Sequence, residues 1–389
     1  MMTTQTGAPR RARAAVTGAF AVHGLTTAAW VARIPQIKEH LGLGAGVFGI
    51  ALLGAPLGVV LAVRFAGRCV ARWGSRAVTL WAGTVGALAP ACVAFAGNLP
   101  SLIAALLLMG AALGLMDVAM NAQGVAVERA YGRPIMSGLH GSYSVGTLGA
   151  ALVGAAAAHG SVPVRVHLPV ASLVLVAALW LGCRGLLGRA ADEPFAASAD
   201  VPGRGPAARG ALLMLGVIGL CSFVGEGAMA DWSAVYLRED LGTGPGAAGL
   251  GYAGCAVAMT LGRLAGDRVV ARFGAVAVLR TGSAVAAGGL GLGLLARDPV
   301  AAVAGFTLFG LGVAAVAPVT FSAAGNLPGV PSAAGIARVT SLGYLGLLGG
   351  PPVIGFVAEG VGLGWALAVP VVLVAAIVPL GRAAAAARG

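Results

Sequence analysis

The chain repeats itself at an offset of 200 residues, and it does so within an almost wholly apolar sequence. The match needs no gap between positions 39 and 78. Identical residues in the two copies are Glu39/Glu239, Leu41/Leu241, Gly42/Gly242, Gly44/Gly244, Gly46/Gly246, Gly49/Gly249, Gly54/Gly254, Leu61/Leu261, Arg68/Arg268, Val70/Val270, Ala71/Ala271, Arg72/Arg272, Gly74/Gly274, Ala77/Ala277 and Val78/Val278. Because this period is far longer than that of a solenoid, the repeat indicates a duplicated half-molecule.

Composition places both halves in a membrane. Hydrophobic residues make up 58% of the 389 positions, charged residues only 10%, and the mean hydropathy is +0.92. A soluble domain has a much higher share of charge. The sequence therefore predicts an all-α membrane protein that crosses the bilayer many times.

Twelve apolar segments are long enough to cross a hydrocarbon core of about 30 Å as helices. They are Ala14–Val31, Val47–Phe65, Ala77–Ala96, Leu102–Val125, Ile135–Ala158, Leu168–Leu187, Ala211–Tyr236, Ala247–Ala265, Val276–Ala296, Val300–Ser322, Gly335–Val357 and Gly364–Leu380. We expect two pseudo-symmetric six-helix bundles, residues 1–187 and 210–389, joined by a polar, proline-containing cytoplasmic linker at 188–209.

Arginine positions predict the orientation. With both termini in the cytoplasm, most arginines fall on cytoplasmic segments, whereas the external loops carry only Arg33, Lys38, Arg165, Arg238 and Arg297. Basic residues are retained on the cytoplasmic side of a membrane, so we expect a multi-pass protein of the cytoplasmic (inner) membrane. The net charge of +12 then reflects orientation and contact with anionic lipids, and gives no support to nucleic-acid binding.

Ionisable side chains inside a span cost about 2.5–3.5 kcal/mol each, so each one is a functional candidate. Asp117 and Asn121 lie one helical turn apart on one face of the fourth predicted span. Burial disfavours a charged carboxyl, so a cavity that alternately fills with water and dries would release and load a proton at Asp117. The alternative is that Asp117, Asn121 and Gln123 only hydrogen-bond neighbouring helices together.

The seventh predicted span carries two carboxylates. Glu226 is a second candidate for proton coupling, with a purely structural role as its alternative. Asp231 is rotated about 140° from Glu226 around the helix, which places it beside Trp232 at the external boundary. For Asp231 we expect a gating or capping role, and Trp232 is a candidate substrate contact.

Two histidines and Arg338 are further candidates within spans. His23 is a candidate contact for substrate or proton, because it falls near the middle of the first span, and His140 near the inner end of the fifth is a weaker one. Arg338 would pair with a carboxylate or bind an anionic substrate.

Charged turns follow the second and eighth predicted spans. Arg68 and Arg72 in the first turn, and Asp267, Arg268 and Arg272 in the second, would pair with each other or with helix ends to close an inner gate. The alternative is that these charges only set the topology.

Enzyme motifs are not evident in the sequence. The five cysteines have no metal-type spacing, and nothing resembles a nucleotide-binding loop or an ordered catalytic triad. We expect no enzyme activity, no cofactor, no metal and no disulfide.

Four sequence strings resemble the fucose permease-like branch of the major facilitator superfamily. They are MDVAMN at 116–121, VGEGAMADW at 224–232, PVTFS at 318–322 and GGPPVIG at 349–355. The resemblance implies a monomeric twelve-helix transporter in which Asp117 takes the position of the proton-coupling carboxylate, and Glu226 and Trp232 match positions in the seventh helix. One position departs from the branch: Val31 stands where it has an aspartate implicated in sugar recognition, and His23 replaces a tryptophan.

We therefore predict a proton-coupled secondary transporter that takes up a small polar solute by alternating access. A proton-linked efflux pump for a hydrophobic drug or natural product is the alternative within transport. A membrane sensor or scaffold that does not transport is the alternative of another class.

Overall fold

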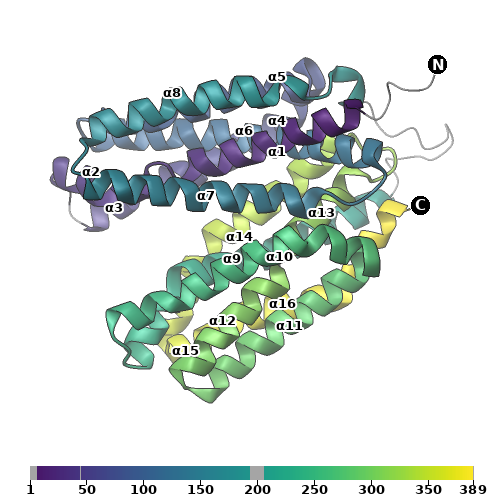
Figure 1. Ribbon diagram of the computed structural model, residues 1–389. Coiled ribbons are helices and arrows are strands. Elements are labelled where there is room, and N and C mark those ends of the chain that lie inside the picture. The colour runs from purple at the N-terminus through teal and green to yellow at the C-terminus, as the bar shows by residue number, and fades with distance from the viewer. Residues whose placement is uncertain (1–6, 44, 193–205, 389) are drawn as a thin grey trace, which may run out of the picture. The chain divides into compact units, whose positions relative to one another are not determined.

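The computed structural model describes residues 7–43, 45–192 and 206–388, and their regular secondary structure is entirely helical (Figure 1). Helices suit this apolar chain because they satisfy their own backbone hydrogen bonds, which lipid cannot do. The α-helices are α1 (Gly7–Ala28), α2 (Ile34–His40), α3 (Ala45–Leu52), α4 (Gly54–Trp73), α5 (Ser75–Ala94), α6 (Leu99–Tyr131), α7 (Met136–His159), α8 (Val164–Gly182), α9 (Pro206–Val235), α10 (Pro245–Phe273), α11 (Ala275–Ala296), α12 (Pro299–Val313), α13 (Val316–Gly325), α14 (Ser332–Val361), α15 (Leu363–Ala366) and α16 (Ala368–Leu380). A π-helical turn, η4 (Tyr236–Asp240), extends α9, and short 3-10 turns flank several other helices.

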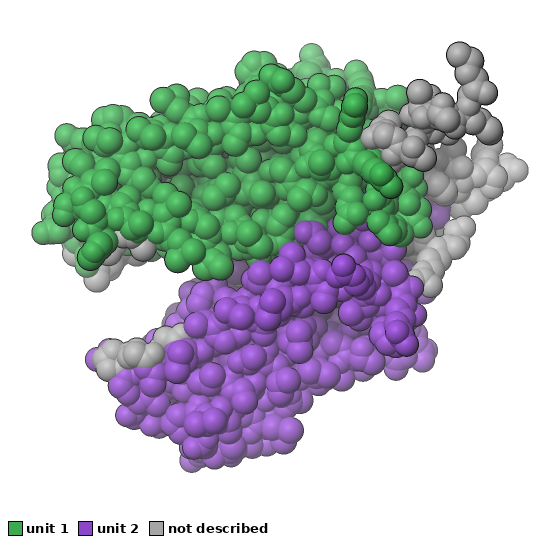
Figure 2. Space-filling view, in the orientation of Figure 1, with its two compact units in different colours: residues 1–133, 139–193, 331–337 green, residues 134–138, 194–330, 338–389 purple. Residues whose placement is uncertain are grey.

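Two compact units divide the chain (Figure 2). The first comprises residues 1–133, 139–193 and 331–337, and the second comprises residues 134–138, 194–330 and 338–389. In the first unit α6 packs against α1, α4 and α5, and α8 packs against α5. In the second unit α12 packs against α10 and α11, and α16 packs against α9 and α11.

Each of the twelve predicted spans corresponds to a helix or to a pair of consecutive helices. Among the described residues, eleven helical stretches are long and apolar enough to cross a membrane. The remaining predicted span, Ala247–Ala265, lies within α10, whose 29 residues are long enough but include six glycines and Arg263, which lower its hydropathy. Most of the predicted linker, residues 193–205, lies outside the described residues.

Three of the predicted spans are each divided into two helices near a proline. The hydropathy pattern did not predict these divisions. Interruptions occur between α3 and α4, between α12 and α13, and between α15 and α16. A proline follows the end of the earlier helix in each case: Pro56 and Pro370 stand four residues after it, and Pro318 stands five residues after it. Proline has no N–H to donate to the carbonyl four residues earlier, and its ring clashes with that carbonyl, so the helix breaks there.

Helix ends reproduce the sequence repeat. Asn98 and Asp298, 200 residues apart, accept hydrogen bonds from the backbone N–H groups of Ser101 and Ala301, both at 2.9 Å, and so cap α6 and α12. Gly74 and Gly274 end α4 and α10 with φ angles of 85° and 80°, a conformation that favours glycine. The internal repeat therefore continues in the structure beyond the matched sequence.

Glycine allows helices to approach closely at equivalent places in the two units. A Cβ atom added to Gly110 on α6 would collide with the carbonyl oxygen of Ala55 on α4. Added to Gly310 on α12, it would collide with the carbonyl oxygen of Cys255 on α10. Because Ala55 and Cys255 are also 200 residues apart, the same backbone-to-backbone approach occurs at equivalent places in both units.

These two contacts predict which glycines tolerate alanine. Replacing Gly110 or Gly310 by Ala forces the paired helices apart, and overpacking of this kind costs about 1–3 kcal/mol. Thermal unfolding of the purified variants in detergent should therefore show a clear loss of stability. The control is Gly288→Ala on α11, where an added Cβ has no neighbour within 4 Å. Equal stability of all three variants would contradict this role of the contacts.

Candidate functional site

The predicted pair on α6 forms a buried polar cluster in the first unit. Asp117 is 8% exposed and Asn121 is fully buried. The Asn121 side-chain Nδ2 donates to Asp117 Oδ1 at 3.1 Å and to the Asp117 backbone carbonyl at 2.8 Å. The contact follows from the helix itself, since residues four apart lie on the same face.

His140 on α7 extends this cluster, although the sequence made it only a weak candidate. Its Nε2 lies 3.2 Å from Asn121 Oδ1. Since an amide oxygen only accepts, Nε2 is the donor of this hydrogen bond. The edge of the Phe20 ring from α1 lies against the imidazole, with ring centroids 5.1 Å apart. The amide of Asn121 thus links a carboxyl group and an imidazole that come from different helices.

His23 on α1 is buried against the same stretch of α6. Its Nε2 lies 3.1 Å from the backbone carbonyl of Leu113, one turn before Asp117, and its ring lies 5.5 Å from that of Tyr143 on α7. The Nδ1 atom is buried without a hydrogen-bond partner. Because a carbonyl requires a donor, the proton of the neutral ring resides on Nε2 and the lone pair on Nδ1.

The second unit contains a buried ion pair that the sequence did not predict. Arg263 Nη2 on α10 donates to Glu226 Oε2 on α9 at 3.2 Å, and Ser222 Oγ donates to Glu226 Oε1 at 3.0 Å. The two ionic side chains are only 9% and 20% exposed. In the sequence, Arg263 is one of the arginines that indicate the orientation in the membrane. Nothing local could reveal its partner, because 37 residues separate the two positions.

The other candidates of the second unit are spread over two helices. Asp231 on α9 is exposed, and Trp232 beside it is half-buried. The Trp232 ring lies close to Gly355 of α14, because a Cβ atom added to that glycine would be about 3.5 Å from the ring. Arg338 on α14 is also exposed. In the described part of the chain, Arg338 forms no ion pair with a carboxylate, which was one of its two expected roles.

Charged residues of the two turns contact either a helix end or an aromatic ring. Asp267 on α10 accepts a hydrogen bond at 3.0 Å from the backbone N–H of Gly138 in the first turn of α7, and so contacts a helix end. Arg68 and Arg72 on α4 lie over Phe65 and Trp73 of their own helix, both at 5.9 Å from the ring centroid.

In the second half, Arg272 likewise lies over Phe273, at 5.5 Å, and Arg268 is exposed. Arg68, Arg72 and Arg272 therefore stack on neighbouring aromatic rings. Pairs between the arginines of the turns and carboxylates are not seen among the described residues.

Two curated relatives are similar to this chain over most of its length. An uncharacterized MFS-type transporter of Yersinia pestis is 40% identical over 342 residues, which are 88% of this chain and 87% of the relative. An uncharacterized transporter of Sinorhizobium fredii is 35% identical over 354 residues, 88% of this chain and 90% of the relative. No protein-family model matches the chain.

Solved structures share the fold at low sequence identity. The outward conformation of FucP, a major facilitator superfamily transporter, matches with a TM-score of 0.76 at 16% identity and covers 95% of this chain and 97% of that one. The proton:xylose symporter XylE matches with a TM-score of 0.73 at 13% identity, covering 96% and 95%. At these identities the likeness concerns the fold alone.

The helical membrane architecture, the duplicated halves and the similarity to curated relatives agree with one another. Those relatives are transporters and not enzymes. The chain belongs to the major facilitator superfamily of multi-pass membrane transporters.

Proposed function

We propose that the protein is a proton-coupled secondary transporter that takes up a small polar solute across the cytoplasmic membrane by alternating access. The observation that carries the proposal is the buried Asp117, whose side chain is held by the amide of Asn121. Membership of the superfamily supports transport as such. Among solved structures of the same fold, the Escherichia coli protein FucP is a fucose:proton symporter and XylE is a proton:xylose symporter.

Asp117 suits reversible proton binding because no cation compensates its charge. Within the described residues, Asp117 has no ion pair, and its side-chain partner is a neutral amide. A carboxyl without a cation is more stable in its neutral form where water is excluded, and in its ionised form where water enters. A change in hydration during the transport cycle would therefore load and release one proton.

Glu226 is proposed as a second coupling group of a different kind. Its carboxylate pairs with the guanidinium of Arg263, which carries a permanent charge. A proton that binds Glu226 would remove the negative charge from this pair. Glu226 would thereby couple proton binding to a rearrangement between α9 and α10.

The remaining candidates are assigned to substrate and gate. We propose His23, Asn121, Trp232 and Arg338 as substrate contacts, because they combine hydrogen-bonding groups, an aromatic face and a cation in spanning helices. The gating group is proposed to comprise Arg68, Arg72, Asp231, Asp267, Arg268 and Arg272. Of these, Asp267 is positioned by its bond to the start of α7.

The proposed function is tested by recording internal pH in proteoliposomes while sugars, polyols, amino acids and cationic drugs are added outside. Acidification with one compound identifies the substrate and shows symport. Alkalinisation would instead support the alternative of proton-linked efflux. If no compound changes the internal pH although the protein is correctly folded, the assignment is contradicted for those classes of compound.

Neutralising Asp117 should separate coupling from substrate movement. Asp117→Asn retains a polar side chain of similar size but cannot ionise, so accumulation driven by a pH gradient should be abolished while exchange of labelled substrate persists. The matched control is Asp298→Asn, which also converts a carboxylate to an amide but keeps the helix cap, as Asn98 does in the other half. Undiminished driven accumulation in Asp117→Asn would remove this residue from the mechanism.

The ion pair of the second unit predicts a non-additive loss of stability. Glu226→Gln or Arg263→Gln alone breaks the pair while one of its charges stays within the spanning helices, at a cost of about 3–5 kcal/mol. The double variant removes both charges and should recover most of that loss. Thermal unfolding of the wild type, the two single variants and the double variant in detergent gives the coupling energy. The control is Arg209→Gln, which changes an exposed arginine near the start of α9. Additive losses would show that the pair does not act as a unit.

A further inference from the structure

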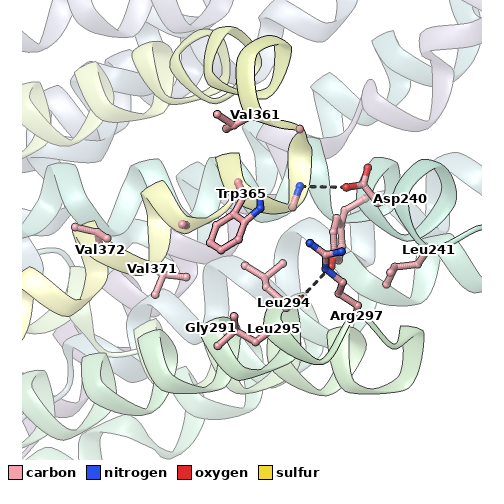
Figure 3. Close-up of a pocket in the computed structure, with 14 residues that line it drawn as sticks. Asp240, Leu241, Gly291, Leu294, Leu295, Arg297, Val361, Trp365, Val371 and Val372 are labelled. Atoms are coloured by element: carbon pink, nitrogen blue, oxygen red, sulfur yellow. Dashed lines mark hydrogen bonds between the residues drawn. The ribbon is translucent and has the colours of Figure 1, made fainter.

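A cavity of about 420 Å³ lies in the second unit, apart from the polar clusters described above (Figure 3). Its walls come from η4, α11, α14, α15 and α16. The arrangement of charge and apolar surface around this cavity indicates what it would bind.

The cavity lies where the membrane-spanning helices end. Asp240 is the last residue of one candidate span, Arg297 follows directly on another, and Val361 is the last residue of a third. Gly362 and Gly364 flank the start of the next span. The cavity therefore lies at the level where hydrocarbon meets lipid headgroups. By the distribution of arginines this is the external surface.

One side of the cavity is apolar and open. Leu295 on α11 is 70% exposed and Val372 on α16 is 65% exposed, although both are large hydrophobic residues. Trp365 is 60% exposed, and Figure 3 shows it between Val372 and the charged end. Tryptophan is enriched at this level of a membrane, and apolar surface exposed there faces lipid chains.

The other side carries one charge of each sign. Figure 3 shows Asp240 and Arg297 together at the end of the cavity remote from Val372. Asp240 Oδ2 accepts a hydrogen bond at 3.1 Å from the backbone N–H of Gly364, which fixes the carboxylate. Arg297 takes a left-handed backbone conformation, with φ of 50°, immediately after α11. Among the described residues, neither side chain forms an ion pair.

We propose that this cavity binds one molecule of a zwitterionic phospholipid with a primary amine, phosphatidylethanolamine, from the external leaflet. The guanidinium of Arg297 would bind its phosphate, for which it offers several N–H donors in one plane. The carboxylate of Asp240 would accept hydrogen bonds from its ammonium group. One acyl chain would lie along Leu295 and Val372, with Trp365 at the headgroup boundary.

Charge complementarity selects this lipid over others. An anionic headgroup such as phosphatidylglycerol would pair with Arg297 but offers no cation to Asp240, whose carboxylate would repel it. Phosphatidylcholine has the same net charge, but its quaternary ammonium has no N–H to donate. A free phosphate ion would leave the apolar wall uncovered.

Native mass spectrometry of the full-length protein in detergent tests the proposal with phosphatidylethanolamine, phosphatidylcholine and phosphatidylglycerol added separately. We expect phosphatidylethanolamine to bind about tenfold more tightly than the other two, the difference typical of one charge-assisted hydrogen bond. Equal binding of all three lipids, or tighter binding of phosphatidylglycerol, would overturn the proposal. This comparison needs no variant and does not depend on the transported substrate.

Variants then locate the site. Arg297→Gln should weaken binding of phosphatidylethanolamine about tenfold. The control is Arg238→Gln, which should leave binding unchanged. Arg238 is also exposed and lies at the same end of the second unit, but it does not line the cavity. Asp240→Asn keeps an acceptor for Gly364 but removes the charge, so the preference for phosphatidylethanolamine over phosphatidylglycerol should be lost. If Arg238→Gln and Arg297→Gln bind equally well, the lipid does not occupy this cavity.

A filling variant provides a second check that leaves both charges in place. An added Cβ at Gly291 would lie 3.5 Å from Val371, which is an ordinary contact. Gly291→Val should therefore fold normally while its side chain occupies the cavity and reduces binding of phosphatidylethanolamine. Unchanged binding in a folded Gly291→Val protein would also overturn the proposal.

Discussion

Backbone contact between helices at Gly110 and Gly310 is the constraint on which both bundles depend. Lipid tails are as apolar as leucine, so the hydrophobic effect does not hold helices together within a bilayer, and close packing must do so. At these two positions the absence of a side chain brings α6 to the backbone of α4 and α12 to the backbone of α10. The other helices of each unit then pack around these pairs. Because the contacts are 200 residues apart, duplication of one half accounts for both.

Tight packing leaves few places for polar groups, and the two units hold their buried carboxylates in different ways. Asp117 has a neutral partner in Asn121, which in turn contacts His140. Glu226 has a cationic partner in Arg263. The first arrangement leaves the charge of the carboxylate uncompensated, whereas the second requires that charge. The duplicated halves have therefore diverged in chemistry while their packing remained alike.

Divergence is also visible at the helix ends. The repeat places His40 and Gly97 in the first half where Asp240 and Arg297 stand in the second. The two opposite charges at one end of the lipid-binding cavity are thus not repeated at these positions of the first half. Since the shared packing does not need these two residues, their presence is consistent with a function that only the second half performs. Such charges cost less at helix ends, where water and headgroups are within reach, than at the level of Asp117.

The sequence by itself determined the helical fold, the twelve spans and the duplication, because hydropathy and a gapless repeat are properties of consecutive residues. It also determined the contact between Asp117 and Asn121, which follows from one helical turn. The breaks at Pro56, Pro318 and Pro370 were present in the sequence too, but a hydropathy window does not register a lost backbone hydrogen bond.

Only the tertiary structure decided that His140 joins Asn121 and that Arg263 pairs with Glu226. It also decided that Asp240 and Arg297 meet at one cavity. These contacts depend on how each helix is rotated about its axis against its neighbours. That rotation is set by packing summed over whole helix faces, which no local pattern of residues contains.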